Sequence, residues 1–141
     1  MPSPRRSPSS TRSATRSTEY VLAVAVATYA DAIGVPLVAS KNGAYSSARV
    51  GAAYKRMGVR AGFPDLNIPK VGGRDEPGLY VELKAPGRGL RANQREWQQR
   101  LRREGYVCEV VHTLEEFKEL VANYLSGDGP EFERTVCVRV F

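Results

Sequence analysis

The chain has 141 residues, a hydrophobic fraction of 42% and a formal net charge of +6. This length predicts a single domain, and two cysteines with one histidine exclude a disulfide framework and a zinc-finger ligand set. No apolar run reaches the roughly 20 residues that a membrane span needs, so no membrane contact is expected. The low cysteine content favours a reducing compartment such as the cytoplasm.

The positive charge is concentrated at the N-terminus. Residues 1–18 hold four arginines and no acidic residue, whereas residues 19–141 hold 17 basic and 15 acidic side chains. The first segment is rich in Ser, Thr, Pro and Arg, with too few apolar residues to offset the entropy lost on ordering. We therefore predict a disordered basic arm over residues 1–18.

Helices alternate with short strands in the rest of the chain. Helices are predicted over residues 19–33, 46–57, 91–104 and 113–125. Strands are predicted over residues 35–39, 65–69, 79–84 and 106–111. A glycine- and proline-rich link over residues 70–78 predicts that the second and third strands form an antiparallel hairpin. This α-β-α-β-β-α-β-α order predicts an α/β fold with a mixed central sheet flanked by helices.

The last segment, residues 126–141, is predicted to be a C-terminal extension. It begins with a polar, acidic break over residues 126–133. Val136, Val138 and Val140 then alternate with other residues, which is typical of a strand. We therefore predict an edge strand over residues 135–141.

Charged residues lie inside or beside the two hairpin strands. Glu82 and Lys84 are two residues apart, so they project from the same face of their strand. If the two strands pair about a turn near residue 74, Asp65 lies beside the end that carries Lys84. Two close carboxylates repel each other unless a cation or a proton lies between them. A divalent cation with oxygen ligands, such as Mg²⁺, would relieve this repulsion.

A Glu-x-Lys triplet in a strand is, taken alone, more often a solvated face with a weak ion pair. The flanking residues favour a site instead. Residues 62–64, Gly-Phe-Pro, bend the chain as it approaches Asp65, and Pro86 ends the strand that carries Glu82 and Lys84.

The motifs around these residues resemble those of a nuclease family. Gly62-Phe63-Pro64-Asp65, Glu82-Leu83-Lys84-Ala85 and Gln94, early in the next helix, are similar to the VRR-NUC (virus-type replication-repair nuclease) domain. That domain belongs to the PD-(D/E)xK nuclease superfamily. The resemblance extends over residues 19–125 and implies a restriction-endonuclease-like nuclease domain there. Residues 41–43 and 57–62 resemble the stand-alone phage and bacterial members.

The resemblance implies a metal-dependent phosphodiesterase. Asp65 and Glu82 would hold Mg²⁺ or Mn²⁺, with the main-chain carbonyl of Leu83 as a further ligand. Lys84 would orient or help to activate the attacking water and counter developing negative charge. Gln94 would position the Lys84 amine or that water.

Two of the implied roles have structural alternatives. Family members begin with a helix that bears a glutamate, and Glu19 matches it in position, which would make it a further metal ligand. Alternatively, the Glu19 charge favours the positive end of its own helix. Gln94 has the alternative of a solvent-facing amide on its helix.

Basic residues near the motifs predict contacts with DNA. Residues 88–103 hold six arginines and one acidic residue, and neutralising phosphates with such residues would give salt-dependent binding. An ordinary solvated helix face is the alternative. Nothing in the pattern specifies bases, so recognition of DNA shape is expected rather than of sequence. The candidate DNA-contacting residues are Lys41, Arg60, Arg88, Arg91 and Arg95.

These observations lead to the hypothesis of a metal-dependent DNA endonuclease selective for branched DNA, such as four-way junctions or flaps. The resemblance further implies phage or prophage replication, recombination or repair in the cytoplasm of a bacterial host cell. A homodimer is expected because a symmetric junction presents two equivalent strands. Two alternatives stay open: a non-catalytic DNA-binding module with the nuclease fold, and a sequence-specific restriction-type endonuclease.

Overall fold

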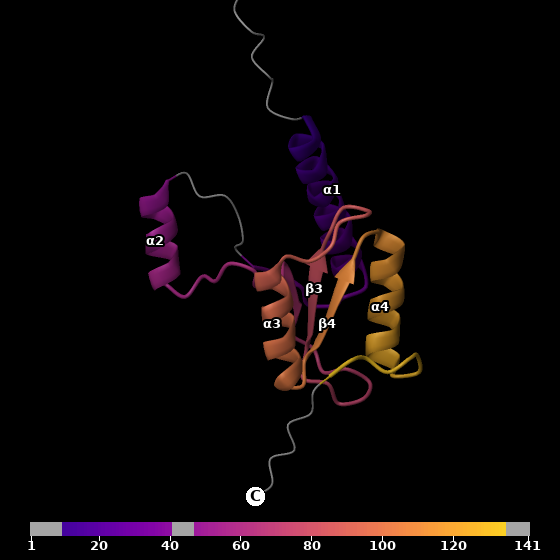
Figure 1. Cartoon of the computed structure of the whole chain (residues 1–141). Coiled ribbons are helices and arrows are strands. Elements are labelled where there is room, and N and C mark those ends of the chain that lie inside the picture. The colour runs from indigo at the N-terminus through magenta and orange to yellow at the C-terminus, as the bar shows by residue number, and fades with distance from the viewer. Residues whose placement is uncertain (1–9, 41–46, 135–141) are drawn as a thin grey trace, which may run out of the picture.

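The computed structural model describes residues 10–40 and 47–134 (Figure 1). Its helices are α1 (Ser10–Ala32), α2 (Ala48–Arg56), α3 (Ala92–Arg103) and α4 (Leu114–Ser126). Its strands are β1 (Val38–Ala39), β2 (Leu66–Ile68), β3 (Leu79–Leu83) and β4 (Val107–Val111). The predicted order of helices and strands is confirmed. None of the helices described is long and apolar enough to cross a membrane.

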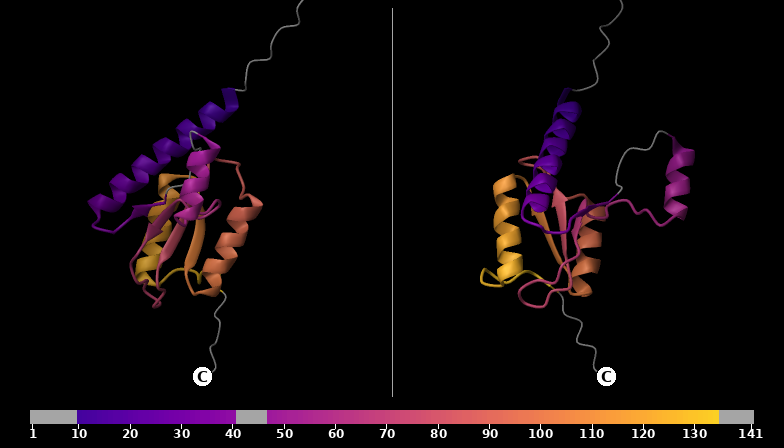
Figure 2. Two further views of the ribbon diagram at one scale, coloured as in Figure 1. Left: turned by 90° about the vertical axis from the view of Figure 1, so that its left-hand side faces the viewer. Right: turned by 180° about the vertical axis from the view of Figure 1, so that it is seen from behind.

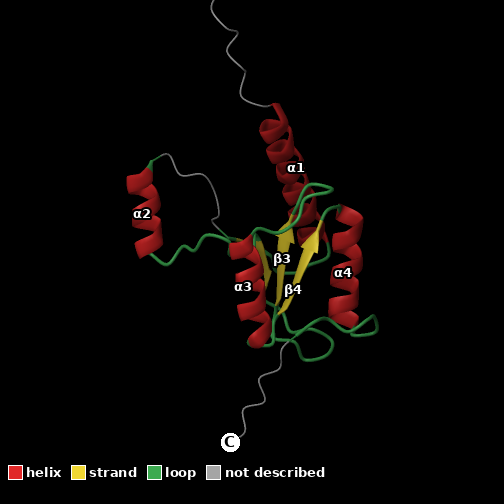
Figure 3. Cartoon of the chain, viewed as in Figure 1, coloured by secondary structure: helices red, strands yellow, loops and turns green. Residues whose placement is uncertain are grey.

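The four strands form one mixed sheet in the order β1-β2-β3-β4 (Figure 3). β2 pairs antiparallel with both of its neighbours, and Leu66 lies opposite Val81 while Ile68 lies opposite Leu79. This register confirms the predicted hairpin with its turn near residue 74. β4 lies parallel to β3. Because parallel neighbours need a long crossover connection, α3 lies between them in the chain.

The main hydrophobic core lies between the sheet and the helices α1 and α4, while α3 covers the opposite face (Figures 1 and 2). Leu79, Val81 and Leu83 alternate along β3 and share this core with Val26 of α1 and Phe117 of α4. Burying each such side chain contributes roughly 1.5–3 kcal/mol. The core therefore fixes β3 in the middle of the molecule, together with the charged residues at its carboxyl end.

An aromatic cluster packs α3 against the other face of the sheet. The Phe63 ring packs edge to face on Tyr80 of β3 and on Trp97 of α3. The distances between ring centroids are 5.4 Å and 5.1 Å. The Tyr80 ring also meets Tyr106 at 5.2 Å. Edge-to-face pairs of this kind add about 0.5–1.5 kcal/mol beyond their buried area. The cluster therefore fixes α3 and the bend before β2 relative to β3.

α1 begins at Ser10, nine residues before its predicted start. The predicted disordered arm over residues 1–18 is therefore wrong for its second half. Extending a helix by one residue costs far less than nucleating it, and residues 10–18 contain neither glycine nor proline to end it. Residues 1–9 lie outside the described residues.

Thr113 is the N-cap of α4. The Thr113 hydroxyl accepts a 3.1 Å hydrogen bond from the Glu116 N–H, and the Glu116 carboxylate accepts one of 2.7 Å from the His112 N–H. The helix ends at Gly127, whose φ of 72° is left-handed and favours glycine. The edge strand predicted over residues 135–141 lies outside the described residues.

Candidate active site

Asp65 lies where the chain enters β2. The bend before it depends on Gly62, which has a φ of 83° and lies so close to Asn93 that an added Cβ would come within 2.8 Å. The Asp65 carbonyl accepts a 2.7 Å hydrogen bond from the Ser40 N–H beside β1. Its carboxylate Oδ2 accepts a 2.9 Å hydrogen bond from the Leu83 N–H. The carboxylate is therefore held against the end of β3.

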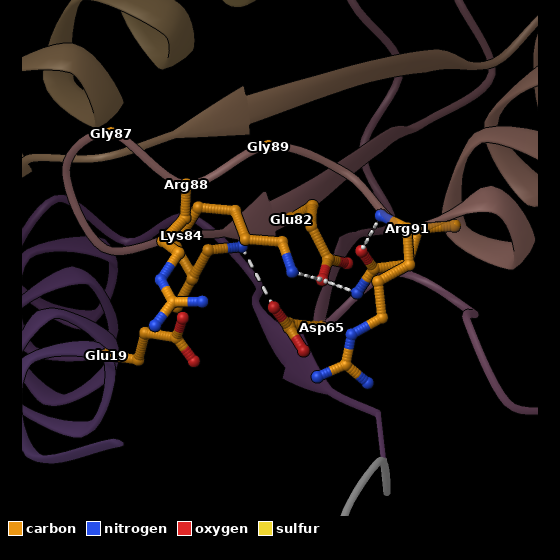
Figure 4. Close-up of a pocket in the computed structure, with 10 residues that line it drawn as sticks. Glu19, Asp65, Glu82, Lys84, Gly87, Arg88, Gly89 and Arg91 are labelled. Carbon is orange, nitrogen blue, oxygen red and sulfur yellow. Dashed lines mark hydrogen bonds and ion pairs between the residues drawn. The ribbon is translucent and has the colours of Figure 1, made fainter. Parts of the chain in front are cut away.

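Glu82 and Lys84 lie at this same end of β3, next to Asp65 (Figure 4). Their exposed fractions are only 4% and 8%, and Lys84 Nζ lies 3.9 Å from Glu82 Oε1. Charged side chains are rarely buried to this degree unless they are paired or bind a metal. The structure thus brings together the three charged residues that the sequence placed near one point.

Gln94 joins the group from the first turn of α3. Its Nε2 donates a 2.8 Å hydrogen bond to Glu82 Oε1, and its Oε1 accepts one of 2.8 Å from the Arg91 N–H. The side chain was expected to position the Lys84 amine or a water, and it instead contacts the Glu82 carboxylate. The alternative of a solvent-facing amide is wrong, because both ends of the amide have protein partners.

The two carboxylates are difficult to ionise together. Burial raises the pKa of Asp65, although the Leu83 N–H and the Lys84 ammonium oppose this shift. Burial also raises the pKa of Glu82 to about 8, with the Asp65 charge adding to the shift and Lys84 opposing it. Burial and mutual repulsion therefore both disfavour the doubly charged form of this pair. A divalent cation between the carboxylates would favour the charged form of both.

The group opens into a cavity of about 630 Å³ (Figure 4). The lining residues are Glu19, Asp65, Glu82, Leu83, Lys84, Gly87, Arg88, Gly89, Arg91 and Gln94. Glu19 enters from α1, and its Oε1 accepts a 3.4 Å hydrogen bond from the Ala85 N–H. Because α1 begins at Ser10, Glu19 lies inside the helix, and the interpretation that it favours the positive end of that helix is wrong.

The donor set fits a hard divalent cation. The carboxylates of Asp65 and Glu82 could supply oxygen ligands, and Leu83 lines the same cavity. Across residues 10–40 and 47–134, no three His, Cys, Asp or Glu side chains are arranged as a complete metal cluster. Mg²⁺ commonly uses one or two protein carboxylates and completes its shell with water and substrate phosphate. Two adjacent carboxylates facing an open cavity meet that requirement.

A family model of the VRR-NUC domain matches residues 12–114. The chain belongs to the VRR-NUC family. One solved structure, described as a VRR-NUC domain protein, is 34% identical to this chain with a TM-score of 0.49. The match covers 57% of this chain and 64% of the other, which is less than two thirds of its length. No curated protein matches.

Membership of the VRR-NUC family confirms the predicted family and identifies a nuclease-type domain. In the described residues, the four-stranded mixed sheet with its four helices confirms the predicted fold class. The match begins at residue 12, inside the segment that the sequence assigned to the arm. The helical start of α1 at Ser10 agrees with this earlier beginning.

Two of the predicted DNA-contacting residues of this VRR-NUC chain, Arg60 and Arg95, do not line the cavity. The Arg60 guanidinium donates a 2.7 Å hydrogen bond to the Lys55 carbonyl at the end of α2. The Arg95 guanidinium donates one of 2.5 Å to the Leu90 carbonyl. Both side chains therefore stabilise local backbone, while Lys41 lies outside the described residues.

Sequence reasoning missed two residues that line the VRR-NUC site and one contact to the main chain of Lys84. Gly87, with a φ of 79°, and Gly89 flank Arg88 and line the cavity without side chains of their own. Their position directly after the strand with Glu82 and Lys84 was an available signal. His112 Nδ1 lies 3.3 Å from the Lys84 carbonyl oxygen. No sequence signal indicated this contact, because it depends on the parallel pairing of β3 with β4.

Proposed function

We propose that this chain is a Mg²⁺- or Mn²⁺-dependent DNA endonuclease that hydrolyses phosphodiester bonds. One observation carries the proposal: the half-buried carboxylate of Asp65 and the buried carboxylate of Glu82 converge with the Lys84 ammonium at an open cavity. Burial and mutual repulsion raise the pKa values of both carboxylates, and a divalent cation between them would oppose both effects. Membership of the VRR-NUC family supports the same chemistry.

Each side chain has a role in this proposal that follows from its contacts. Asp65 and Glu82 would hold the cation, with the Leu83 carbonyl and Glu19 as further oxygen donors from the cavity wall. When bound, the cation would lower the pKa of a water and stabilise charge on the scissile phosphate. Lys84, whose amine reaches Glu82 Oε1, would orient the attacking water and oppose the negative charge that develops on the phosphate.

Gln94 acts as a positioning residue. Its amide holds Glu82 Oε1 while the Arg91 N–H holds the amide itself. A carboxylate fixed in this way keeps its remaining lone pairs directed at the cavity. Residues that orient a metal ligand commonly change activity by about 10–100-fold when removed.

The proposed substrate is branched DNA, such as a four-way junction or a flap, during phage or prophage replication, recombination or repair in a bacterial cytoplasm. Arg88 and Arg91 line the cavity, where the backbone phosphates of a cut strand would lie. The basic groups that line the cavity are suited to phosphate contacts, which carry no base information. A homodimer would present two such cavities to the two equivalent strands of a symmetric junction.

Cleavage assays on labelled DNA test the proposal. Four-way junction, flap, linear duplex and single strand would be incubated with the chain in EDTA, Mg²⁺ or Mn²⁺. We expect cleavage only with a divalent cation, fastest on junction or flap, and none with Asp65→Asn. Binding without cleavage in either metal would favour the non-catalytic module. Cutting of linear duplex at one fixed sequence would favour the restriction-type enzyme.

A further inference from the structure

The peptide group between Lys84 and Ala85 lies just past the end of β3. Ala85 is only 8% exposed, so the polar atoms of this peptide need hydrogen-bond partners within the protein. Its N–H donates a 3.4 Å hydrogen bond to Glu19 Oε1, and its carbonyl oxygen lies 3.3 Å from His112 Nδ1. One peptide group is therefore held from α1 on one side and from the residue after β4 on the other.

The position of the His112 ring is set by its own main chain. The His112 N–H donates a 2.7 Å hydrogen bond to the carboxylate of Glu116 in the first turn of α4. The Lys84 N–H donates a 3.0 Å hydrogen bond to the carbonyl of Val111, the last residue of β4. Both main-chain polar groups of Lys84 thus contact consecutive residues, Val111 and His112. The pairing of β3 with β4 continues through a side chain where β4 has ended.

The direction of the contact follows from its two atoms. A carbonyl oxygen can only accept a hydrogen bond, so the hydrogen must be on Nδ1 of His112. In the neutral ring this leaves Nε2 without a hydrogen. The side chain is half-buried and does not line the cavity. His112 therefore acts on the site through the peptide that it holds.

Two parts of the proposed site are attached to this peptide (Figure 4). Lys84 carries the ammonium that lies 3.9 Å from Glu82 Oε1, and Glu19 is one of the carboxylates that line the cavity. The peptide is planar, so its carbonyl and its N–H turn together. Any rotation of the Lys84 carbonyl would therefore also turn the Ala85 N–H away from Glu19. By holding the carbonyl, the His112 ring restrains the contacts on both sides of the peptide.

The turn that follows the peptide presents a third side chain to the cavity. The Ala85 carbonyl accepts a 3.0 Å hydrogen bond from the Arg88 N–H, which closes a β-turn. Pro86 and Gly87 occupy its two middle positions, and the φ of 79° at Gly87 is what a type II turn needs there. Figure 4 shows the Arg88 guanidinium pointing toward the Glu19 carboxylate. The position of Arg88 thus also depends on the peptide before the turn.

We propose that His112 is a positioning residue of the active site. Its Nδ1–H holds the Lys84–Ala85 peptide, and this peptide sets the positions of the Lys84 ammonium and the Glu19 carboxylate at the cavity. The inference rests on the proposed function, because it assigns His112 a part in the same reaction. The contact itself involves only side chains and main chain of the protein, so it is measurable without metal or DNA.

Nuclear magnetic resonance of the ¹⁵N-labelled chain in EDTA tests the contact directly. His112 is the only histidine of the chain, so the two ring nitrogens give signals that no other residue can confuse. At pH 8 we expect a hydrogen on Nδ1 and none on Nε2. A hydrogen on Nε2 alone would overturn the proposal, because Nδ1 could then not donate to the Lys84 carbonyl.

Two substitutions of His112 separate the hydrogen bond from the volume of the ring. His112→Leu fills the space without a donor, whereas the side-chain amide of His112→Asn carries a donor near the position of Nδ1. His112→Leu is expected to lower Mg²⁺-dependent cleavage of a four-way junction by about 10–100-fold, as for other residues that orient a group of a metal site. His112→Asn should restore the rate to within a few-fold of the unmodified chain.

Thr113→Ala is the matched control for a loss of stability at this place in the chain. It removes the hydroxyl that accepts a hydrogen bond from the Glu116 N–H, so it weakens the start of α4 one residue away from His112. The ring of His112 and the Lys84 carbonyl are retained. We expect this variant to cleave at the rate of the unmodified chain, at a temperature where circular dichroism shows every variant folded.

Hydrogen exchange of the Ala85 N–H gives a readout that needs neither metal nor DNA. This N–H contacts Glu19 on the far side of the peptide, so a peptide released by His112 should open more often. We expect protection of the Ala85 N–H to be lost in His112→Leu. It should be kept in His112→Asn and in Thr113→Ala.

The outcomes separate this role from the nuclease function. Cleavage by His112→Leu at the rate of Thr113→Ala would overturn the positioning role, and so would a folded His112→Asn that is as slow as His112→Leu. An unmodified chain that cuts no DNA in Mg²⁺ or Mn²⁺ would overturn the nuclease function. In that case a hydrogen on Nδ1, with loss of Ala85 protection in His112→Leu, would still support the hold of His112 on the peptide. Unchanged Ala85 protection in His112→Leu would overturn that hold.

Discussion

The main-chain N–H of Leu83 donates a hydrogen bond of 2.9 Å to the Asp65 carboxylate. Leu83 lies between Glu82 and Lys84, so this contact ties one carboxylate of the site to the strand that carries the other. Its side chain is buried in the core, which prevents the strand end from moving independently. The spacing of the charged groups is therefore set by the packing of β3, before any ligand binds.

Lys84→Met is expected to lower Mg²⁺-dependent cleavage by about 10²–10³-fold, because it removes the ammonium that would face the developing charge. DNA affinity in EDTA should change little, since Lys84 is only 8% exposed. Single-turnover rates and filter binding would measure the two effects. Lys70→Met, at an exposed position near the other end of the hairpin, is the matched control. Undiminished cleavage by Lys84→Met would remove this residue from the mechanism.

The stability of the metal-free protein is expected to fall as the pH rises. The pKa of Glu82 is raised from 4.5 to about 8 in the folded chain, so the folded state binds more protons than the unfolded state between these values. The protonated Glu82 side chain therefore contributes most to the free energy of unfolding below pH 4.5. This contribution is lost as the pH rises past about 8. The raised pKa of Asp65 acts in the same direction.

Thermal unfolding in EDTA between pH 5 and pH 9 would measure this dependence. Glu82→Gln should flatten the curve and raise the melting temperature at pH 9, while abolishing cleavage. Glu115→Gln, at a side chain that is 81% exposed, should leave the curve unchanged. A profile for Glu82→Gln that parallels the unmodified chain would show that Glu82 ionises normally.

Added Mg²⁺ or Mn²⁺ is expected to raise the melting temperature at pH 8, by an amount that grows with the metal concentration. The physical reason is that the cation binds the ionised carboxylate pair of the folded chain and offsets their repulsion. Asp65→Asn and Glu82→Gln should each reduce the increase. Equal stabilisation of all three proteins would indicate that the ion binds elsewhere.

Much of this arrangement could be predicted from the sequence because it depends on local pattern. The hairpin follows from the alternating apolar residues of β3 and from the glycine-rich link before it. Once the hairpin is formed, Asp65 and Glu82 must lie close together. The contact of Gln94 with Glu82 could not be predicted. It depends on the position of α3 against the sheet, which the packing of Phe63 on Trp97 fixes. The early start of α1 escaped prediction because Ser and Thr, which make up most of residues 10–18, have a low preference for helix.

Gln94→Ala is expected to reduce cleavage by about 10–100-fold, because Glu82 loses the amide that orients it. The loss should appear mainly in the rate at saturating Mg²⁺ and less in DNA affinity. Gln99→Ala, at an exposed position later in the same helix, is the matched control. If Gln94→Ala cleaves at the rate of Gln99→Ala, the hydrogen bond to Glu82 has no part in catalysis.

Arg91→Ala is expected to weaken DNA binding for every sequence alike and to reduce the slope of log affinity against log salt by about 1. The reason is that Arg91 lines the cavity, where its guanidinium would contact a backbone phosphate. Its main-chain N–H still holds Gln94 after the substitution, so the arrangement around Glu82 is retained. Fluorescence anisotropy in EDTA at several salt concentrations would measure the slope. Arg103→Ala, exposed in the last turn of α3 and away from the cavity, should leave it unchanged. An equal loss of slope in both variants would indicate a general effect of net charge rather than a phosphate contact at the cavity.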